Sequence, residues 1–495
     1  MWNKIKIYFI CFAKCVYLFH VIKNGPKILK IVITTTFVLA IILLSIKNIS
    51  TVKKNEERPG AFTDNKITPE EITLVPIEEK QVDILQKDNL VNSSQIIVRG
   101  INSNNQLGIS DQKKETISDS IISAPEFIDI AVGNNHSVGL TKTGEVYTWG
   151  HNDAGQLGRT IESKDNNDGV PTKINFSKKI ISIDAVYDHT ILLAENGTVW
   201  GFGSNFTGQL GDGTNENSTK AVQSKNISGI IKIATGDKFT LALNNSGEVY
   251  AWGGSCAPSS ERILKQFQQG PLNLVGGYYD PFIDPERGYN QNQDCLNEDA
   301  VGIKSKIPRK IDGLPKIKEI SAGYGHALLL STEGKVWSFG CNLYGQLGHG
   351  KFGNFIDNLK EDPTGNPANS IPKEIANLEN ITSVKAGYRH SVALDSAGKV
   401  YTWGFQTRTE NQGSKIFNNA TPAIIYSKIP FKYIQAGYDY SIFTDNDQYV
   451  YSYGVNTKNL ISPKNTTYVF EPTKLFSEKI SEISGGKIHL IGLKK

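Results

Sequence analysis

The sequence predicts an all-β fold: a seven-bladed β-propeller that is preceded by an N-terminal transmembrane helix and a flexible tether. Three observations lead to this prediction. A unit of about fifty residues recurs seven times from residue 95 to residue 495. The first and the last copies are each only half of a unit, so that each completes the other. One long apolar stretch, residues 28–46, precedes all of the copies.

The apolar stretch ILKIVITTTFVLAIILLSI, residues 28–46, contains a single charge, Lys30. At 1.5 Å per residue a helix of this length spans about 28 Å, close to the ~30 Å hydrocarbon core of a bilayer. A cleaved signal peptide is the alternative. The stretch is long for a signal core and no small-residue cleavage site follows it, so we expect a transmembrane signal-anchor.

The residues before the apolar stretch set its expected orientation. Residues 1–58 carry ten lysines and arginines against two glutamates, and six of the lysines precede Ile31. This bias favours a basic cytoplasmic leader at 1–27 and a propeller outside the cytoplasm. Residues 5–22 are also apolar, and a second span there would place the propeller in the cytosol. Lys14 and His20 favour a membrane-surface helix instead, because a charge within a span is costly.

Residues 47–94 have few aromatic residues and no sustained period, and they contain Pro59-Gly60 and Pro69-Glu70-Glu71. Such a composition does not bury enough apolar surface to fold alone. We therefore expect a flexible tether between the membrane and the propeller.

The repeat unit is clearest at residues 133–158, GNNHSVGLTKTGEVYTWGHNDAGQLG. Two alternating segments, HSVGL and EVYTW, flank the break at Thr143-Gly144, which is typical of a β-hairpin. The glycine that closes the second segment is Gly150, and its counterparts are Gly100, Gly203, Gly253, Gly340, Gly404 and Gly454. Because pairing of the two terminal half-units would leave no exposed sheet edge, we predict a closed ring rather than an open array.

Three units carry a specific motif: TWGHNDAGQLG at 148–158, GFGSNFTGQLG at 201–211 and SFGCNLYGQLG at 338–348. Each follows a first half of the type AGxxH. These units resemble the regulator of chromosome condensation repeat family, and the resemblance covers about four fifths of the chain. It implies a seven-bladed propeller, in agreement with the count of units.

A histidine recurs in the motif, at His136, His189, His326 and His390, whereas the corresponding place in the other units is assigned to Phe239, Tyr440 and Ile488. Since apolar residues replace the imidazole, we interpret this position as inward packing rather than as a metal site. Other repeated positions are also interpreted as structural. They are Trp149, Trp252 and Trp403 before the closing glycine, and Gly155, Gly208 and Gly345 in turns that need positive φ, where Asn105 and Asn459 substitute.

Two insertions interrupt the repeat, at 254–308 and 349–372, and both leave the same strand end. They are therefore expected to rise from one face of the ring, where loops on a rigid scaffold commonly bind partners. Aromatic residues are frequent anchors of protein interfaces, and the candidates are Tyr278, Tyr279, Phe282, Tyr289, Phe352 and Phe355. A self-packed decoration without a partner is the alternative.

The larger insertion also contains Cys256 and Cys295, a candidate disulfide that would suit an oxidising compartment. Cys341 makes the local count odd, so that pairing with it, or no pairing, stays open. Acidic residues of the same insertion lack the spacing of a calcium loop, and a solvated acidic loop is the expected explanation.

Charge and motifs limit the function. Outside residues 1–58 the chain has 43 basic and 47 acidic residues, which disfavours binding to nucleic acid. We find no GxSxG, HExxH, CxxC or phosphate-loop motif, and we therefore predict no enzyme, no cofactor and no metal.

The favoured function is a membrane-tethered module that binds a protein partner through one face of the propeller, outside the cytoplasm. One alternative, implied by the resemblance, is a guanine-nucleotide exchange factor for a small GTPase, which requires a cytosolic propeller. The residues for that activity lie outside the repeat motif, and none is assigned here. A second alternative, suggested by exposed tyrosines, is a carbohydrate- or cell-wall-binding module.

Overall fold

The computed structural model describes residues 93–109, 115–161, 167–254, 305–342, 344–352, 371–410, 413–464 and 466–494. Within these ranges the strands form seven four-stranded antiparallel sheets, as the sequence predicted. The expected leader, the stretch 28–46 and most of the tether lie outside the described residues. A helix with the length and apolar character needed to cross a bilayer does not occur within the part of the chain that the structure describes.

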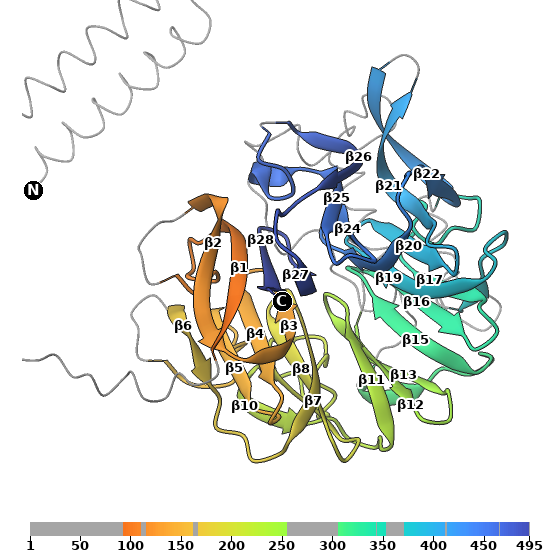
Figure 1. Cartoon of the computed structure of the whole chain (residues 1–495). Helices are drawn as coiled ribbons and strands as arrows, with labels where there is room; N and C mark the ends of the chain where they lie inside the picture. The colour runs from red at the N-terminus through yellow and green to blue at the C-terminus, as the bar shows by residue number, and fades with distance from the viewer. Residues whose placement is uncertain are drawn as a thin grey trace, which may run out of the picture. The chain divides into compact units, whose positions relative to one another are not determined.

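The sheets follow one another around a common axis (Figure 1), and we call the space between their innermost strands the channel. Six blades are formed by four consecutive strands each. The first blade consists of β3 (Phe127–Val132), β4 (His136–Thr141), β5 (Val146–His151) and β6 (Asn167–Lys173), and the second of β7 (Ile180–Val186), β8 (His189–Ala194), β9 (Val199–Gly203) and β10 (Ser218–Gln223). The third consists of β11 (Ile230–Thr235), β12 (Phe239–Asn244), β13 (Val249–Gly253) and β14 (Ser305–Lys310). The fourth blade consists of β15 (Ile317–Ala322), β16 (His326–Ser331), β17 (Val336–Gly340) and β18 (Lys373–Glu374), and the fifth of β19 (Ile381–Ala386), β20 (His390–Asp395), β21 (Val400–Glu410) and β22 (Gly413–Ile425). The sixth consists of β23 (Phe431–Ala436), β24 (Tyr440–Asp445), β25 (Val450–Val455) and β26 (Tyr468–Lys474), with a 3-10 turn at Thr457–Asn459.

The closing blade joins both ends of the chain. Its strand order is β2 (Glu115–Pro125), β1 (Ser93–Ile101), β28 (His489–Lys494) and β27 (Ile480–Gly485). β1 pairs antiparallel with β28, from Ile96 opposite Leu493 to Gly100 opposite His489. The predicted closure of the ring by pairing of the terminal half-units is thus confirmed.

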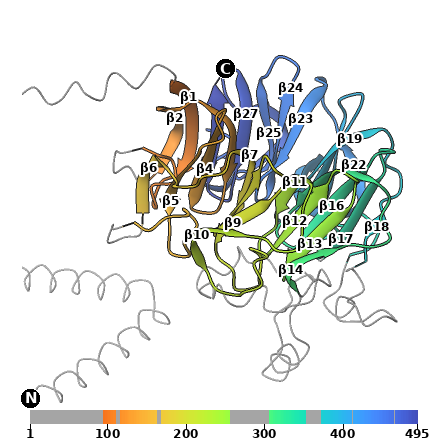
Figure 2. The same ribbon diagram turned by 90° about the horizontal axis from the view of Figure 1, so that it is seen from below.

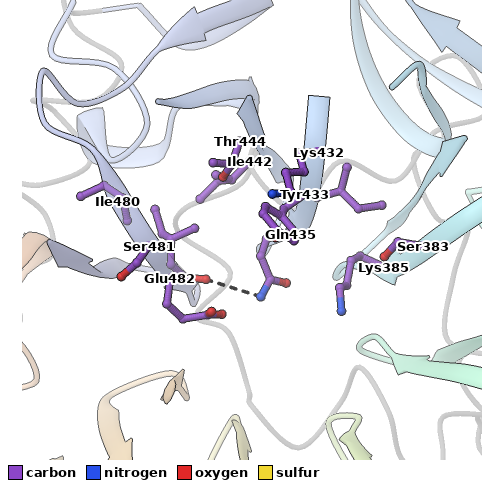
Figure 3. A pocket seen from close by; sticks show the side chains of 12 residues that line it. Ser383, Lys385, Lys432, Tyr433, Gln435, Ile442, Thr444, Ile480, Ser481 and Glu482 are labelled. Atoms are coloured by element: carbon purple, nitrogen blue, oxygen red, sulfur yellow. Dashed lines mark hydrogen bonds between the residues drawn. The ribbon is translucent and has the colours of Figure 1, made fainter. Parts of the chain in front are cut away.

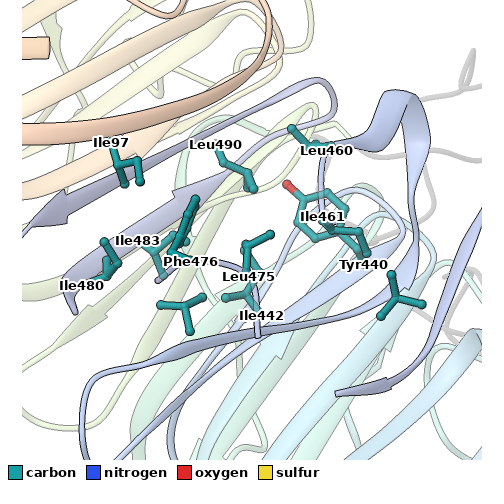
Figure 4. Close-up of a cluster of buried hydrophobic side chains, with 12 residues drawn as sticks. Ile97, Tyr440, Ile442, Leu460, Ile461, Leu475, Phe476, Ile480, Ile483 and Leu490 are labelled. Atoms are coloured by element: carbon teal, nitrogen blue, oxygen red, sulfur yellow. The ribbon is translucent and has the colours of Figure 1, made fainter. Parts of the chain in front are cut away.

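Apolar residues fill the seams between adjacent blades. The second strand of every complete blade is buried along its whole length, because it has a strand on each side and a neighbouring blade on each face. At the closing seam, Ile97 of β1 packs in one cluster with Leu490, Phe476 and Tyr440 (Figure 4). Burial of this cluster therefore depends on both termini being in place.

The loops after the third strands use left-handed backbone, as predicted. Gly155, Gly208 and Gly345 have φ of 87°, 83° and 82°, and Asn105 and Asn459 take the same place with φ of 62° and 59°. The asparagine that opens the loop stabilises it, since the side-chain oxygen of Asn152 accepts a hydrogen bond from Leu157 N at 2.8 Å. Equivalent bonds form at Asn102, Asn205, Asn342 and Asn456.

Both insertions leave the propeller at the same end of its strands. Just after β13, Gly254 N donates to Lys238 O at 3.0 Å, and just after β17, Cys341 N donates to Gly325 O at 2.7 Å. Figure 2 shows the ends of these strands side on. β14 begins at Ser305, inside the range 254–308 that the sequence assigned to the first insertion.

One blade departs from the repeat in a way that the sequence did not predict. β21 and β22 form a long hairpin that ends with Glu410 opposite Gly413, in place of the Gln-Leu-Gly loop. The hairpin projects beyond the neighbouring strands (Figure 1).

Gly155 provides a test of the turn geometry. A β-carbon at Gly155 would lie 2.6 Å from Ser218 O, whereas one at Gly313, also at positive φ, would meet nothing within 4 Å. We expect Gly313→Ala to lower the free energy of unfolding by about 1 kcal/mol through backbone strain. Gly155→Ala should cost at least about 2 kcal/mol more because it also overpacks the seam. Denaturant titration of both variants checks this, and equal losses would contradict the geometry.

Candidate functional site

One face of the propeller carries the seven turns that join the first strand of each blade to the second. The turns have the pattern Gly-x-x-His or a variant of it, and we call this face the turn face. The segments that lead into both insertions begin on the same face, because Gly254 N and Cys341 N, directly after β13 and β17, donate to Lys238 O and Gly325 O of the turns. The turn face therefore combines the repeated turns with the non-repeated segments.

The first variable residue of these turns holds the equivalent place in every blade, in the turn that follows the innermost strand. In ring order the seven occupants are Asn134, Tyr187, Asp237, Tyr324, Tyr388, Tyr438 and Lys487. Four of them form a continuous series of ring contacts, which we call the tyrosine arc: Tyr187, Tyr324, Tyr388 and Tyr438. Successive ring centroids are 6.2, 4.2 and 3.9 Å apart, and the Lys487 ammonium lies 5.0 Å from the centre of the last ring. The channel end is thus lined by aromatic side chains that hold one another in place.

Asp237 lies beneath the arc, in the blade between those of Tyr187 and Tyr324. Asp237 is 3% exposed, and neither of its carboxylate oxygens has a hydrogen-bond partner among the residues that the structure describes. Burial raises the pKa of Asp237 to about 7, with the Lys238 charge lowering it and Asp188 raising it. A buried carboxylate without a donor is costly, so that a partner's donor or cation at this place would be stabilised.

The second variable residue of the turns supplies an internal ion pair on the same face. Arg389 and Asp439 are 4% and 6% exposed, and the guanidinium donates two hydrogen bonds to the carboxylate, at 2.9 and 2.7 Å. The guanidinium also lies over the rings of Phe405 and Tyr344, at 3.9 and 5.0 Å. These contacts hold two adjacent turns rigidly beside the tyrosine arc.

The repeated histidine begins the second strand, opposite the closing glycine of the third. The assignment of Ile488 to this position was wrong by one residue. Gly100 lies opposite His489, as Gly150 lies opposite His136. Ile488 is instead a turn residue. The error arose because Gly485-Gly486 offers two places at which the motif can be aligned, and only the strand register separates them.

The imidazoles connect neighbouring blades. His136 Nε2 lies 2.9 Å from Thr190 Oγ1 of the next blade, and His326 Nε2 lies 2.8 Å from Ser391 Oγ. His390 pairs in the same way with Ser441, and His489 with Ser137. Neither nitrogen of His189 has a hydrogen-bond partner within the described part of the chain. Burial lowers the pKa of His390 to about 4 and that of the other four to about 3, so the rings stay neutral.

The partner of each histidine changes together with it. In the seams that contain a histidine, the residue that follows the histidine position in the next blade carries the hydroxyl. Where Phe239 replaces histidine, that residue is Ala327, and where Tyr440 replaces histidine, it is Leu490. All five blades that follow a histidine have serine or threonine there. Hydroxyl and imidazole therefore act as a pair, and their loss is matched.

The repeated tryptophans serve the same seams. The indole N–H of Trp149 donates to Gln106 O of the preceding blade at 3.0 Å, and Trp252 and Trp403 make the equivalent bonds to Gln209 O and Gln346 O, both at 2.8 Å. All three side chains are fully buried. Among the described residues, no group of three histidine, cysteine or acidic side chains is placed to hold a metal ion.

Of the candidate partner-binding residues, the structure describes only Phe352, which is 51% exposed just beyond the loop after β17. The others, Tyr278, Tyr279, Phe282, Tyr289 and Phe355, lie outside the described residues. The same is true of the candidate disulfide, Cys256 and Cys295. The tyrosine arc was not predicted from the sequence, although its signal is present as a tyrosine two residues before the histidine slot in GYGH, GYRH and GYDY.

Comparison with known proteins identifies relatives of this arrangement. Two family models, both described as the regulator of chromosome condensation (RCC1) repeat, match residues 143–193, 196–243 and 333–394, and residues 127–156, 180–209, 317–346 and 381–408. Protein pim1 of Schizosaccharomyces pombe is 29% identical over 384 residues, which cover 67% of this chain and 70% of that protein. The human regulator of chromosome condensation is 27% identical, with coverage of 66% and 72%.

Solved structures agree with the fold. Yeast RCC1 (Prp20), crystallised with Kap60, aligns with a TM-score of 0.62 at 21% identity, covering 89% of this chain and 97% of that one. Prp20p from Saccharomyces cerevisiae aligns with a TM-score of 0.61 at 22% identity, with coverage of 82% and 92%. Human WBSCR16 gives a TM-score of 0.61 at 16% identity, with coverage of 81% and 99%. At these identities the likeness shows the fold.

The pairing of imidazole and hydroxyl across a seam can be tested by a double-mutant cycle. His326→Phe and Ser391→Ala are each expected to lower the free energy of unfolding by about 1–3 kcal/mol, because each leaves a buried partner unsatisfied. The double variant, which reproduces the natural pair Phe239 and Ala327, should cost about 1 kcal/mol less than the sum.

The control combines His326→Phe with Ser452→Ala. Ser452 also donates its buried hydroxyl to a loop carbonyl, Ile461 O at 2.6 Å, but this bond lies within a single blade, away from His326. Its effect should add to that of His326→Phe. Additivity in both cycles, measured by denaturant titration, would contradict the pairing.

Proposed function

Because the chain carries RCC1 repeats that close into a seven-bladed propeller, we propose that it is a protein-interaction module whose partner binds the turn face. The single observation that carries this proposal is the tyrosine arc, with Asp237 beneath it and Lys487 at its end. Two chain insertions leave the propeller on the same face. The repeated histidines and tryptophans, by contrast, form contacts between neighbouring blades.

The chemistry of the arc fits protein recognition. Tyrosine supplies a large contact area at low entropic cost, and residues that dominate interface energies are often tyrosines in well-packed surroundings. Tyr388 and Tyr438 are stacked at 3.9 Å with an interplanar angle of 17°, so that little ordering remains to be done on binding. Asp237 adds specificity, since a partner that brings a donor to this carboxylate is favoured over one that does not.

We further propose that the propeller is tethered to a membrane by residues 28–46 and lies outside the cytoplasm. The support is the apolar stretch, the excess of lysines before it and the composition of residues 47–94. In this arrangement the partner is an extracytoplasmic or surface protein. The tether gives the turn face reach while keeping it at a high local concentration near the membrane.

A second candidate function is guanine-nucleotide exchange on a small GTPase. It is favoured by the similarity to the human regulator of chromosome condensation and by Prp20p, whose described binding partners are Gsp1p and histones. This function needs a cytosolic propeller. It would use the same turn face, so that topology rather than the site distinguishes the two functions.

The topology is tested by adding protease to intact cells or spheroplasts. We expect cleavage within residues 47–94 from outside, leaving the propeller as a released fragment. Full protection until the membrane is permeabilised would overturn the extracytoplasmic placement. The purified protein would then be assayed for release of labelled GDP from Gsp1p, with Asp237→Asn as the variant that removes the buried charge.

The turn face is tested by site-specific photocrosslinking in the native cell. A photoreactive phenylalanine at Tyr187 should give a discrete crosslinked product, which Lys487→Ala reduces at least threefold because it removes the cation at the other end of the arc. The matched control is the same probe at Tyr426, which is 81% exposed and outside the turn face. Identical products from both positions, or none from Tyr187, would refute binding at this face.

A further inference from the structure

The opposite end of the channel carries a second ring of variable residues, set by a bulge in each blade. The innermost strand of all seven blades has a register shift that spans its second residue, for example between Phe127 and Asp129. The equivalent shifts occur in β7, β11, β15, β19, β23 and β27. A bulge leaves one residue unpaired and re-aims its side chain. We call the seven residues at these bulges the bulge ring.

The bulge ring is divided into an apolar part and a polar part. In ring order its members are Ile128, Ile181, Ile231, Lys318, Thr382, Lys432 and Ser481, and all seven are exposed. The three isoleucines, which we call the isoleucine arc, belong to consecutive blades and are 51%, 46% and 49% exposed. Three adjacent β-branched side chains at one channel mouth form an apolar patch without a covering element among the described residues.

Acidic side chains lie just inside the isoleucine arc. Asp129 directly follows Ile128, Asp184 follows Ile181 by three residues, and Glu482 directly follows Ser481. A strand advances about 3.3 Å per residue, so that these carboxylates lie within roughly 10 Å of the rim along the channel. Asp129 Oδ2 accepts a hydrogen bond from Ile183 N of the next blade at 3.4 Å, so that it lies beside the residue that precedes Asp184. The charges of Glu482 and Asp184 both raise the pKa of Asp129.

The cations nearby are already engaged. Lys385 lies 3.5 Å from Glu319, and Lys232 Nζ donates to Lys318 O at 2.9 Å. Burial, followed by the charges of Glu482 and Asp184, raises the pKa of Asp129 to about 7, and burial also raises the pKa of Asp184 and of Glu482. Lys385 also attracts the charges of Asp184 and Glu482, whereas the charges that act on Asp129 are the negative ones of Glu482 and Asp184. Asp129 is therefore the carboxylate of this group that a partner's cation would stabilise most.

A cavity of about 300 Å³ opens between β19, β23 and β27 at this end of the channel. It extends from the bulge residues Lys432 and Ser481 to the channel residues, and Figure 3 shows Lys385, Gln435 and Glu482 directed toward the same space. Gln435 Nε2 donates to Ile483 O at 3.4 Å across the seam. The mouth thus has room for an inserted side chain beside the acidic group.

We propose that this channel mouth binds an extended segment of a partner protein, whose lysine enters the channel toward Asp129 and Glu482 while aliphatic neighbours of that lysine pack on the isoleucine arc. Lysine suits the site better than arginine. Asp184 already accepts hydrogen bonds from Ala185 N and Thr235 N, one on each carboxylate oxygen. A planar guanidinium binds best to both oxygens of one carboxylate, whereas the carboxylates here lie on different strands. A compact ammonium with three donors matches that arrangement.

The surface is distinct from the turn face, so that one propeller would bind two partners at opposite ends of its channel. The assignment does not depend on the function proposed for the turn face. Loss of binding at one end should leave binding at the other unchanged.

The proposal is tested by selecting random heptapeptides on the full-length protein and measuring the affinity of the enriched sequences. We expect enrichment of lysine flanked by isoleucine, leucine or valine. Asp129→Asn and Ile181→Lys should each weaken binding of a selected peptide at least tenfold. The matched control is Ile121→Lys, since Ile121 is also 46% exposed but lies on β2, and it should leave the affinity unchanged.

The pH dependence gives an independent readout. As the pH falls through about 7, Asp129 gains a proton and its attraction for the lysine is lost, so that the dissociation constant should rise between pH 8 and pH 6. Glu482, Asp184, Glu319, Lys385 and Lys232 are the other charged groups at this end of the channel, with Lys318 and Lys432 on its rim. The dependence should largely disappear in Asp129→Asn.

Three results would overturn the proposal. They are selection without lysine enrichment, equal effects of Ile181→Lys and Ile121→Lys, and a wild-type dimer that Ile181→Lys converts to a monomer. The last result, measured by sedimentation, would identify a second copy of this chain as the occupant of the isoleucine arc.

Discussion

The hydrogen bonds that cross each seam between blades are the constraint on which the structure depends. A four-stranded blade cannot bury its own faces, and it gains a core only against its neighbours. At a complete seam, the backbone carbonyl of the glutamine in one blade accepts from the tryptophan indole and the hydroxyl of the next, as Gln346 O does from Trp403 and Ser391. The same hydroxyl meets the buried imidazole of His326. Apolar packing supplies the energy of the seam, and this small polar group fixes its alignment.

In two seams both the histidine and its hydroxyl partner are replaced. An imidazole that lost its hydroxyl would be buried and unsatisfied, whereas replacement of both partners by apolar groups costs little. The pairs Phe239 with Ala327 and Tyr440 with Leu490 follow this rule. The Tyr440 hydroxyl retains a polar contact of its own, since it donates to Gly486 O at 2.7 Å. The repeat therefore tolerates variation at its seams provided that both sides change.

The sequence was sufficient for the fold because the seams repeat and the terminal half-units complement each other. It was insufficient wherever an assignment depended on strand register or on contacts between blades. The slot of the closing blade was placed at Ile488 instead of His489, because Gly485-Gly486 allows two alignments of the motif and only the strand register, with Gly100 opposite His489, separates them. The tyrosine arc was missed for a related reason. Its members are about fifty residues or more apart in the chain, and only the packing of consecutive blades brings the rings of Tyr388 and Tyr438 to 3.9 Å.

Function in a closed repeat is best sought where equivalent positions hold different residues without a matching change across the seam. The turn position occupied by Asp237 and the bulge position occupied by Ile128 are of this kind, because their variation does not serve the seams. Both lie at an end of the channel, where seven equivalent positions converge on one axis and a change in a single blade alters a surface shared by all. An unpaired buried carboxylate and an exposed isoleucine each cost stability in the isolated propeller. A bound partner that supplies the missing contacts would offset both costs.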